Sequence, residues 1–304
     1  MKEVHELLNA VAPYFSEHKS RLECLSMIII GMIAAGTVNL AEVAANIPGP
    51  NVKYNSIYKR IQSFFIQFEL NSAEVAHFIV GLFGFKKCSL IIDRTNWKFG
   101  KQDINYLVLS AQYDNVSIPL FWLSLGKAGN SSTKDRIELL ERFIQHFGVE
   151  MIADICADRE FYGRDWFEYL ASNNIPYTIR LKKDFKDEFE NDLKHLFRKL
   201  HNGDQKIIRS KVVLGQVLSL VGYRDKNGDL TILGTNHNEN KASLRYIQRD
   251  QIEHMFRCMK SQGFNLEDTH ITDPTRLDRL FTVMSLAFVW AYKLGDYVNG
   301  TVAV

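Results

Sequence analysis

The sequence has few cysteines and no paired cysteine motif. Its 304 residues include four cysteines, which are widely spaced and form no CxxC pair: Cys24, Cys88, Cys156 and Cys258. This pattern favours neither a zinc site nor a disulfide framework. Free thiols are typical of a reducing compartment, so a cytoplasmic protein is expected.

Long hydrophobic runs are also missing. The longest apolar stretch, 25–36, is too short to span a bilayer and lies too far along the chain to act as a signal sequence. A second stretch, 281–290, is again too short. No membrane partner is therefore expected. A hydrophobic content of 46% with 24% charged residues is typical of a folded globular protein, so disorder is not expected to dominate.

The charge balance excludes little. A formal net charge of +2 gives only a weak indication of nucleic-acid partners, because carboxylates elsewhere can mask a basic face. The nucleophile motif of a tyrosine or serine recombinase is missing from the sequence, which disfavours covalent catalysis on DNA.

The first 85 residues have the pattern of a small helical domain. Helices are expected over 4–15, 22–35, 40–47 and 54–68, with Asn39 as a cap and Pro48-Gly49-Pro50 as a break. The last helix and the residue before it carry side chains that can reach phosphates or base edges in a major groove, namely Lys53, Tyr54, Tyr58, Lys59, Arg60 and Gln62. The solvated face of an ordinary helical bundle is the alternative.

From residue 89 the periodicity becomes that of strands. The predicted order is strands 89–92, 105–113 and 118–125, helix 134–147, strand 151–157, helix 164–172 and strand 177–181. Turn signals at Gly100 and at Asp114-Asn115 indicate an antiparallel meander for the first three strands. This is the element order of an RNase H-like fold, which needs one more helix. The candidate is 242–262, and an apolar helix over 277–297 follows it.

Between the fifth strand and that helix lies a predicted β-rich insertion. It contains a charged helix over 185–201 and then strands over 206–214, 216–223 and 230–234. The expected class is therefore α/β, with an RNase H-like catalytic core, a β-rich insertion and a helical N-terminal DNA-binding domain. The expected boundaries are 1–85 for the DNA-binding domain, 86–183 for the first part of the core, 184–241 for the insertion and 242–304 for the last helices of the core.

Three carboxylates occupy positions that suit a metal site. Asp93 follows an apolar strand, Asp158 follows another, and Glu253 lies inside the predicted helix 242–262. If they converge, they offer the oxygen ligands that hard cations such as Mg²⁺ choose, as metal-assisted phosphodiester chemistry requires.

Other acids compete for the second and third places. Asp154 shares a strand face with Asp158, and Glu160 is two residues further on. Asp250 lies about one turn before Glu253. Position at the end of a strand favours Asp158, because Asp154 would interrupt an apolar run.

The helix 242–262 has a polar stripe. On a helix of about 100° per residue, Tyr246, Arg249, Glu253 and Lys260 fall within an arc of roughly 60°. Tyr246 and Lys260 would stand roughly 21 Å apart, a span that suits several phosphates along a DNA strand. The alternative is a solvated surface with modest ion pairs.

These residues carry a resemblance to a known family. Tyr246, Arg249, Glu253 and Lys260 match the signature Y-x(2)-R-x(3)-E-x(6)-K of the DDE transposases of bacterial insertion sequences, in the insertion sequence 4 group. The segments 92–97 and 157–161, around the first two acids, are also similar to that group, and the likeness covers most of the chain.

The resemblance implies a DNA transposase. It implies that Asp93, Asp158 and Glu253 bind Mg²⁺, for which Mn²⁺ can substitute, and catalyse strand cleavage and strand transfer. It also implies that Tyr246, Arg249 and Lys260 contact phosphates near the cleaved end. The expected partners are transposon ends and target DNA, with two copies of the chain pairing the ends as a homodimer, in the cytoplasm at the nucleoid.

Two alternatives belong to other functional classes. Many relatives continue past the signature helix into a longer C-terminal region, whereas this chain stops at Val304. A truncated or domesticated transposase that binds DNA without cutting it fits that difference. A metal-dependent nuclease without strand transfer uses the same triad.

Overall fold

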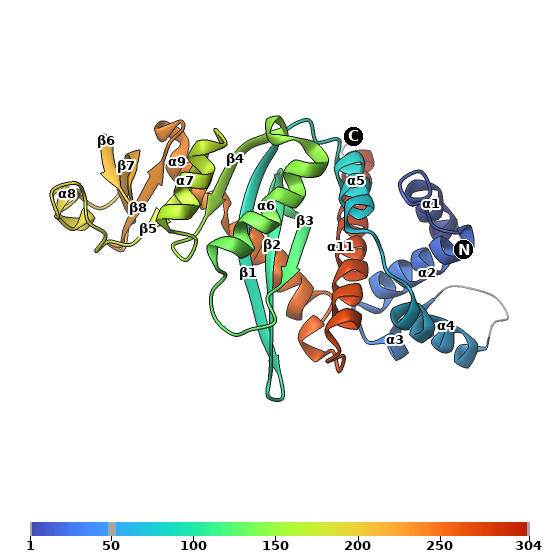
Figure 1. Ribbon diagram of the computed structural model, residues 1–304. Coiled ribbons are helices and arrows are strands. Elements are labelled where there is room, and N and C mark those ends of the chain that lie inside the picture. The colour runs from blue at the N-terminus through green and yellow to red at the C-terminus, as the bar shows by residue number, and fades with distance from the viewer. Residues whose placement is uncertain (1, 48–52, 303–304) are drawn as a thin grey trace.

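Eight strands form one mixed sheet in the computed structural model of the protein, which describes residues 2–47 and 53–302 (Figure 1). The strand order is β3-β2-β1-β4-β5-β8-β7-β6. The first part comprises β1 (Cys88–Phe99), β2 (Gln102–Tyr113), β3 (Val116–Ser124), β4 (Ile152–Ala157) and β5 (Tyr177–Leu181). β1, β2 and β3 pair as an antiparallel meander, and β4 and β5 add to β1 in parallel. The predicted order of core elements along the chain and the predicted antiparallel meander are confirmed.

The strands predicted for the insertion continue the same sheet. They are β6 (Gln205–Val213), β7 (Gln216–Arg224) and β8 (Leu230–Thr235), and β8 pairs antiparallel with β5. The register of β6 against β7 shifts between Ile208 and Lys211, where Ser210 has a φ of 56°. The segment is therefore β-rich as predicted, and its strands belong to the central sheet.

The predicted charged helix over 185–201 is wrong. The structure has a short helix there, α8 (Leu193–Leu196), within a segment of turns. The buried Asp187 carboxylate accepts hydrogen bonds from the backbone N–H groups of Phe189 and Asn191, and Glu190 has a φ of 60°. A side chain that captures backbone donors in this way competes directly with helix formation.

Helices cover both faces of the sheet (Figure 1). One face carries α6 (Thr133–Phe147) and α7 (Arg164–Ser172), and the other carries α9 (Ala242–Gln248), α10 (Asp250–Arg257) and α11 (Pro274–Val302). The ring of Phe143 on α6 packs on Phe121 of β3, whereas Phe281 on α11 stacks on Tyr106 of β2 with 4.4 Å between ring centroids. Tyr106 and Phe121 point to opposite faces, because their positions differ by an odd step in the β2–β3 register.

The single long helix predicted over 242–262 is also wrong in detail. α9 and α10 meet at Arg249, where bonds from Arg249 N to Tyr246 O and from Ile252 N to Arg249 O tighten the turn. A π-helical turn, Cys258–Gln262, then follows α10. Both changes alter the 100° step on which the predicted stripe depends, because the tight turn overwinds the helix and the π turn unwinds it. Short 3-10 turns occur at Val149–Met151, Glu239–Lys241 and Leu266–Asp268.

The described part of residues 1–85 contains five helices, of which the first four lie where helices were predicted and the fifth was not predicted. The five helices are α1 (Lys2–Val11), α2 (Lys19–Ala35), α3 (Leu40–Asn46), α4 (Tyr54–Gln67) and α5 (Ser72–Phe83). The Asn39 side chain caps α3 by accepting from Ala41 N, as predicted, and the break at Pro48-Gly49-Pro50 lies outside the described residues. α11 stands between the sheet and α1–α4 (Figure 1). The Arg279 guanidinium joins α11 to the end of α4 through Phe65 O and Ile66 O.

The four cysteines are free, and three of them are buried. Among the described residues, no single helix is long and apolar enough to cross a membrane. α2 and α3 meet the length and hydropathy requirement when taken together, but they are bent by 96°.

Candidate active site

Asp93 on β1 and Asp158, the first residue after β4, stand side by side because β1 and β4 are adjacent and parallel. β1 and β4 pair with Ile92 opposite Ala157, so each acid is the next residue along its strand. Neighbouring strands lie about 4.8 Å apart. The sequence predicted Asp93 at the end of its strand, but β1 continues to Phe99. Asp93 therefore lies within β1, level with the end of the neighbouring β4. The two carboxylates are thereby placed together by backbone pairing alone.

Arg249 joins Asp93 to Glu253. Its guanidinium donates to Asp93 Oδ2 at 2.7 Å and to Glu253 Oε1 at 2.6 Å. The residue is 5% exposed, and its Nε has no hydrogen-bond partner among the described residues. The tight turn between α9 and α10 directs this arginine towards the sheet. A buried cation therefore occupies the space between the first and third acids.

Tyr246 contacts the second acid. Its hydroxyl donates to Asp158 Oδ1 at 2.8 Å, and Arg180 of β5 lies 3.6 Å from the same oxygen. Arg180 also donates to the Tyr246 hydroxyl at 3.3 Å. Tyr246 is 6% exposed and packs on β4, β7 and β8 through Cys156, Val221 and Leu233. The signature tyrosine and arginine thus face the acids.

Lys260 lies further along the same polypeptide segment. Its Nζ donates to Asn96 O at 3.0 Å and forms an ion pair with Glu267 at 2.8 Å. The π-helical turn that contains Lys260 sets this direction. The other five predicted site residues form one group, because the Arg249 guanidinium lies 5.5 Å from the centre of the Tyr246 ring. Lys260 instead contacts β1 beyond Asp93.

The rival acids have partners of their own. Asp154 forms an ion pair with the buried Arg245 at 2.8 Å. Glu160 accepts from Arg94 Nε at 3.2 Å. Asp154 and Glu160 thus have arginines of their own, whereas Arg249 binds Asp93 and Glu253 and both Tyr246 and Arg180 bind Asp158. The third rival, Asp250, also contacts Arg249, at the longer distance of 3.4 Å. The geometry groups the three predicted acids together.

The two aspartates have different electrostatic surroundings. Burial raises the pKa of Asp93 to about 7; Arg249 and the hydrogen bond from Arg94 N oppose that rise, and the charges of Glu160 and Asp158 add to it. Burial also acts to raise the pKa of Asp158, but hydrogen bonds from Arg159 N and Tyr246 outweigh it and hold that pKa below its usual value. Asp93 is therefore more easily protonated than its neighbour Asp158.

The donor chemistry of the three acids fits a divalent cation. All three offer carboxylate oxygens, the ligands that Mg²⁺ prefers, and a positive group, the Arg249 guanidinium, is already bound by two of them. Within 2–47 and 53–302, no group of three His, Cys, Asp or Glu side chains is positioned to hold one metal ion. Asp93 and Asp158 fit the role as neighbours, and Glu253 is connected to them through Arg249.

Sequence reasoning did not identify three arginines that organise this site. Arg94 follows Asp93 and binds Glu160, Arg180 supports Asp158, and Arg245 fixes Asp154 and donates to Leu90 O of β1. A charged residue inside an otherwise apolar element could have identified them in the sequence, as Arg180 does in the strand Tyr177–Leu181. Such residues need a buried partner, which predicts a nearby carboxylate.

The predicted DNA-facing helix α4 presents part of its polar set to solvent. Tyr54 is exposed and its ring stacks on that of Tyr58, with 6.0 Å between centroids. Lys59 is also exposed, whereas Arg60 donates to Ser20 O of α2 at 3.0 Å. DNA binding by this helix stays a prediction.

Comparisons with known proteins agree with this arrangement. Residues 84–290 match the family model described as "Transposase DDE domain". No curated protein matches the chain.

Two solved structures are similar to the chain. A piggyBac transposase in a synaptic complex with hairpin DNA has a TM-score of 0.52 and 11% sequence identity, and the match covers 98% of this chain and 74% of that one. An endonuclease V from Bacillus subtilis is also 11% identical, with 74% of this chain and 96% of that chain covered, but its TM-score is 0.27. The likeness to the first shows a mixed α/β fold of the RNase H-like kind. With its family match extending over more than half of its length, the chain belongs to the family of DDE transposase domains.

Proposed function

We propose that the protein is a DNA transposase of the insertion sequence 4 group, which binds transposon ends and carries out metal-dependent strand cleavage and strand transfer. The observation that carries the proposal is the connected group around Arg249. Arg249 of the family signature joins Asp93 to Glu253, and the signature tyrosine, Tyr246, donates to Asp158. The Arg249 guanidinium lies 5.5 Å from the centre of the Tyr246 ring, which brings the two sets together. A chance match to the signature would not place these residues in contact.

Asp93, Asp158 and Glu253 are the residues that would hold Mg²⁺ or Mn²⁺. When bound, the ion supplies Lewis-acid stabilisation of the charge that develops on the scissile phosphate. The carboxylates must be ionised for this role, and the Tyr246 hydroxyl and Arg180 favour the ionised form of Asp158. Arg249 favours the ionised form of Asp93 and also donates to Glu253, and it would move away from both acids when the ion binds.

DNA binding and pairing are further parts of the proposal. Helix α4 and the rest of residues 1–85 would bind the transposon end, and Lys260, with Tyr246 and Arg249 once they are released, would contact phosphates near the cut. Two copies of the chain would pair the two ends as a homodimer, and the likeness to a transposase seen in a synaptic complex with hairpin DNA supports this part of the proposal. The expected location is the cytoplasm, at the nucleoid.

One observation favours a second candidate function. Arg249 binds Asp93 and Glu253, so both acids are engaged internally. A non-catalytic DNA-binding regulator would have this property, and a nuclease without strand transfer would share the triad but not the joining step.

One assay separates these functions. The protein is incubated with Mg²⁺ or Mn²⁺, a labelled candidate transposon end and a supercoiled target. Joined products indicate transposition, nicks alone indicate a nuclease, and a shifted but uncut end indicates a regulator.

Substitution of the first acid tests the site. Asp93→Ala should abolish metal-dependent cleavage and leave end binding largely intact, because the acid binds the ion and not the DNA. Asp165→Ala, at an exposed position in the first turn of α7, is the matched control and should cleave normally. Normal cleavage by Asp93→Ala would show that the triad is assigned wrongly.

A further inference from the structure

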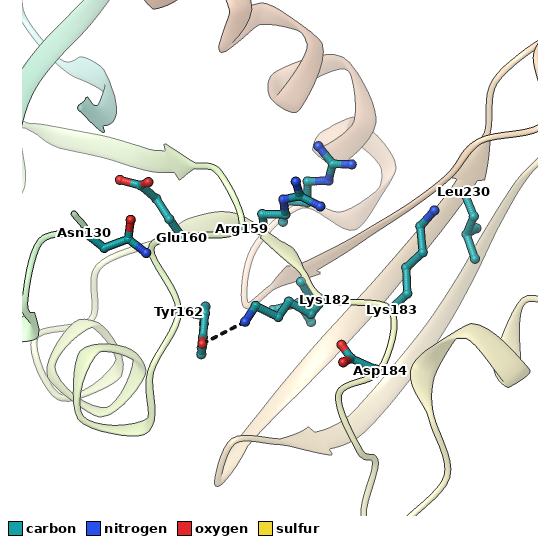
Figure 2. Close-up of a pocket in the computed structure, with 10 residues that line it drawn as sticks. Asn130, Arg159, Glu160, Tyr162, Lys182, Lys183, Asp184 and Leu230 are labelled. Carbon is teal, nitrogen blue, oxygen red and sulfur yellow. Dashed lines mark hydrogen bonds between the residues drawn. The ribbon is translucent and has the colours of Figure 1, made fainter. Parts of the chain in front are cut away.

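A cavity of about 530 Å³ opens next to Asp158 (Figure 2). It lies between the loop that follows β4 and the chain that follows β5. Figure 2 shows Arg159 and Tyr162 from the first segment and Lys182 and Lys183 from the second around one open space. Arg180, which pairs with Asp158, also lines it. We refer to it as the basic cavity.

The lining of the basic cavity has an excess of positive charge. Four lining residues are cationic (Arg159, Arg180, Lys182 and Lys183) and two are acidic (Glu160 and Asp184), so the net lining charge is 4 − 2 = +2. Glu160 is already bound by Arg94, which does not line the cavity, at 3.2 Å. The cavity therefore favours an anionic ligand.

The cations of the basic cavity are largely uncommitted. Lys182 Nζ donates to the Tyr162 hydroxyl at 3.0 Å and has no carboxylate partner within the described residues. The side chains of Arg159 and Lys183, both exposed, form neither a hydrogen bond nor an ion pair with any residue in 2–47 or 53–302. Clustered cations repel one another, and an anion bound between them would relieve that repulsion.

The signature residues Tyr246, Arg249 and Lys260, unlike most cations of the basic cavity, already have partners in the protein. Tyr246 and Arg249 donate to the catalytic acids, and Lys260 is held by Asn96 O and Glu267. Near the acids, the basic cavity thus supplies the cations that can receive a phosphate without first breaking an ion pair.

We propose that the basic cavity is a phosphate subsite that holds the sugar-phosphate backbone of one DNA strand next to the scissile phosphate. The proposal rests on the proposed function, because it takes DNA as the substrate. The size of the cavity is that of a small-ligand pocket, so it admits one or two phosphodiester units of a single strand and not a duplex. Contacts to phosphate position the strand without reading its sequence.

The salt dependence of DNA binding tests this proposal. A fluorescein-labelled single-stranded oligonucleotide of mixed sequence is titrated with the full chain in EDTA, and binding is followed by fluorescence anisotropy. The test variant is Lys182→Gln/Lys183→Gln, and the matched control is Lys86→Gln/Lys87→Gln, an exposed lysine pair just before β1. Both variants lose the same charge, so a difference between them reports on position.

The expected result is a smaller salt slope for the cavity variant. Each lost phosphate contact on a single strand lowers the slope of log K against log salt by about 0.7, so two contacts lower it by about 1.4. Between about 50 and 200 mM salt the wild type should then lose about sevenfold more affinity than the cavity variant. Lys182→Arg/Lys183→Arg should retain the wild-type slope, and circular dichroism checks that each variant is folded.

The outcomes separate the subsite from the proposed function. A slope for the cavity variant equal to that of the wild type, or an equal loss in the control, overturns the subsite even if the wild type cuts transposon ends in Mg²⁺. A reduced slope confined to the cavity variant supports the subsite even if the wild type never cuts DNA, in which case the proposed catalytic function fails by itself.

Discussion

Replacing Arg249 by methionine should expose how strongly the acids depend on an internal cation. Arg249→Met keeps an unbranched apolar side chain but removes the guanidinium and its charge, which leaves Asp93 without its counter-ion at 2.7 Å. Breaking a buried pair by removing one partner costs about 3–5 kcal/mol. Asp93 can escape part of this cost by taking up a proton, because burial already raises its pKa to about 7.

The sign of the pH dependence follows from that raised pKa. A carboxyl group whose pKa is higher in the folded state favours folding while it is protonated and opposes folding once the pH rises above that pKa. Loss of Arg249 removes an opposing influence and raises the pKa of Asp93 further. The destabilisation of Arg249→Met should therefore be close to 3 kcal/mol or more at pH 8 and smaller at pH 6.

Urea denaturation in EDTA and in MnCl₂, together with calorimetric titration of Mn²⁺, measures both consequences. The variant should bind Mn²⁺ at least about tenfold more tightly, a difference of about 1.4 kcal/mol, because the ion no longer competes with a guanidinium. At a hundred times its dissociation constant the ion should restore about 2.7 kcal/mol of stability. Arg257→Met, at an exposed position on α10, is the control and should change neither property.

Two results would refute this reasoning. One is an Arg249→Met protein as stable as the wild type in EDTA at pH 8. The other is a variant that gains no more stability from Mn²⁺ than the wild type does. If Arg249→Met does not fold, Arg249→Lys keeps the charge but loses the fork that joins two carboxylates, and should show a smaller change in the same directions.

Two further predictions concern stability. Gly222→Ala would place a methyl group inside the contact distance of the buried Phe197 ring and should lower the free energy of unfolding by about 1–3 kcal/mol, whereas no loss in urea denaturation would show that the ring can move. Asp135→Ala should cost about 1 kcal/mol at pH 7, because the carboxylate completes the capping box of α6 with Ser132. Burial acts against the ionised form, but hydrogen bonds from Ser132 and Lys127 hold the pKa of Asp135 below its usual value. The cost should therefore shrink as the pH falls below about 4, and a pH-independent cost would contradict this explanation.

The order of elements in the core was predictable from the sequence because each element carries its own periodicity. β4 and β5 are short apolar runs, and α6 begins at a serine with an acid three residues later, so local pattern and final structure agree. Asp93 and Asp158 could be brought together because parallel neighbouring strands leave little freedom in where their side chains meet.

The orientation of the signature stripe could not be predicted in this way. A polar stripe has the same sequence pattern whether it faces water or a buried cluster of opposite charge, and the difference depends on partners distant in the sequence. Tyr246 and Arg249 lie inward because Asp158 and Asp93 are there to receive them. The turn segment before α8 was not predicted for a similar reason. The Asp187 carboxylate accepts hydrogen bonds from backbone N–H groups instead of facing solvent, and the sequence pattern does not distinguish these two cases.

β6, one of the two edge strands of the sheet, has features that oppose self-association of the protein. β6 ends the strand order, so one row of its backbone groups is available for pairing with a strand from another molecule. Lys206, Arg209 and Lys211 lie along it, and the irregular register at Ser210 interrupts its hydrogen-bonding pattern. Charge and an interrupted ladder both oppose edge-to-edge aggregation. Neutral substitutions along β6 should therefore lower solubility before they disturb the candidate site, because Asp158 follows β4, which lies four strands away from β6 in the sheet.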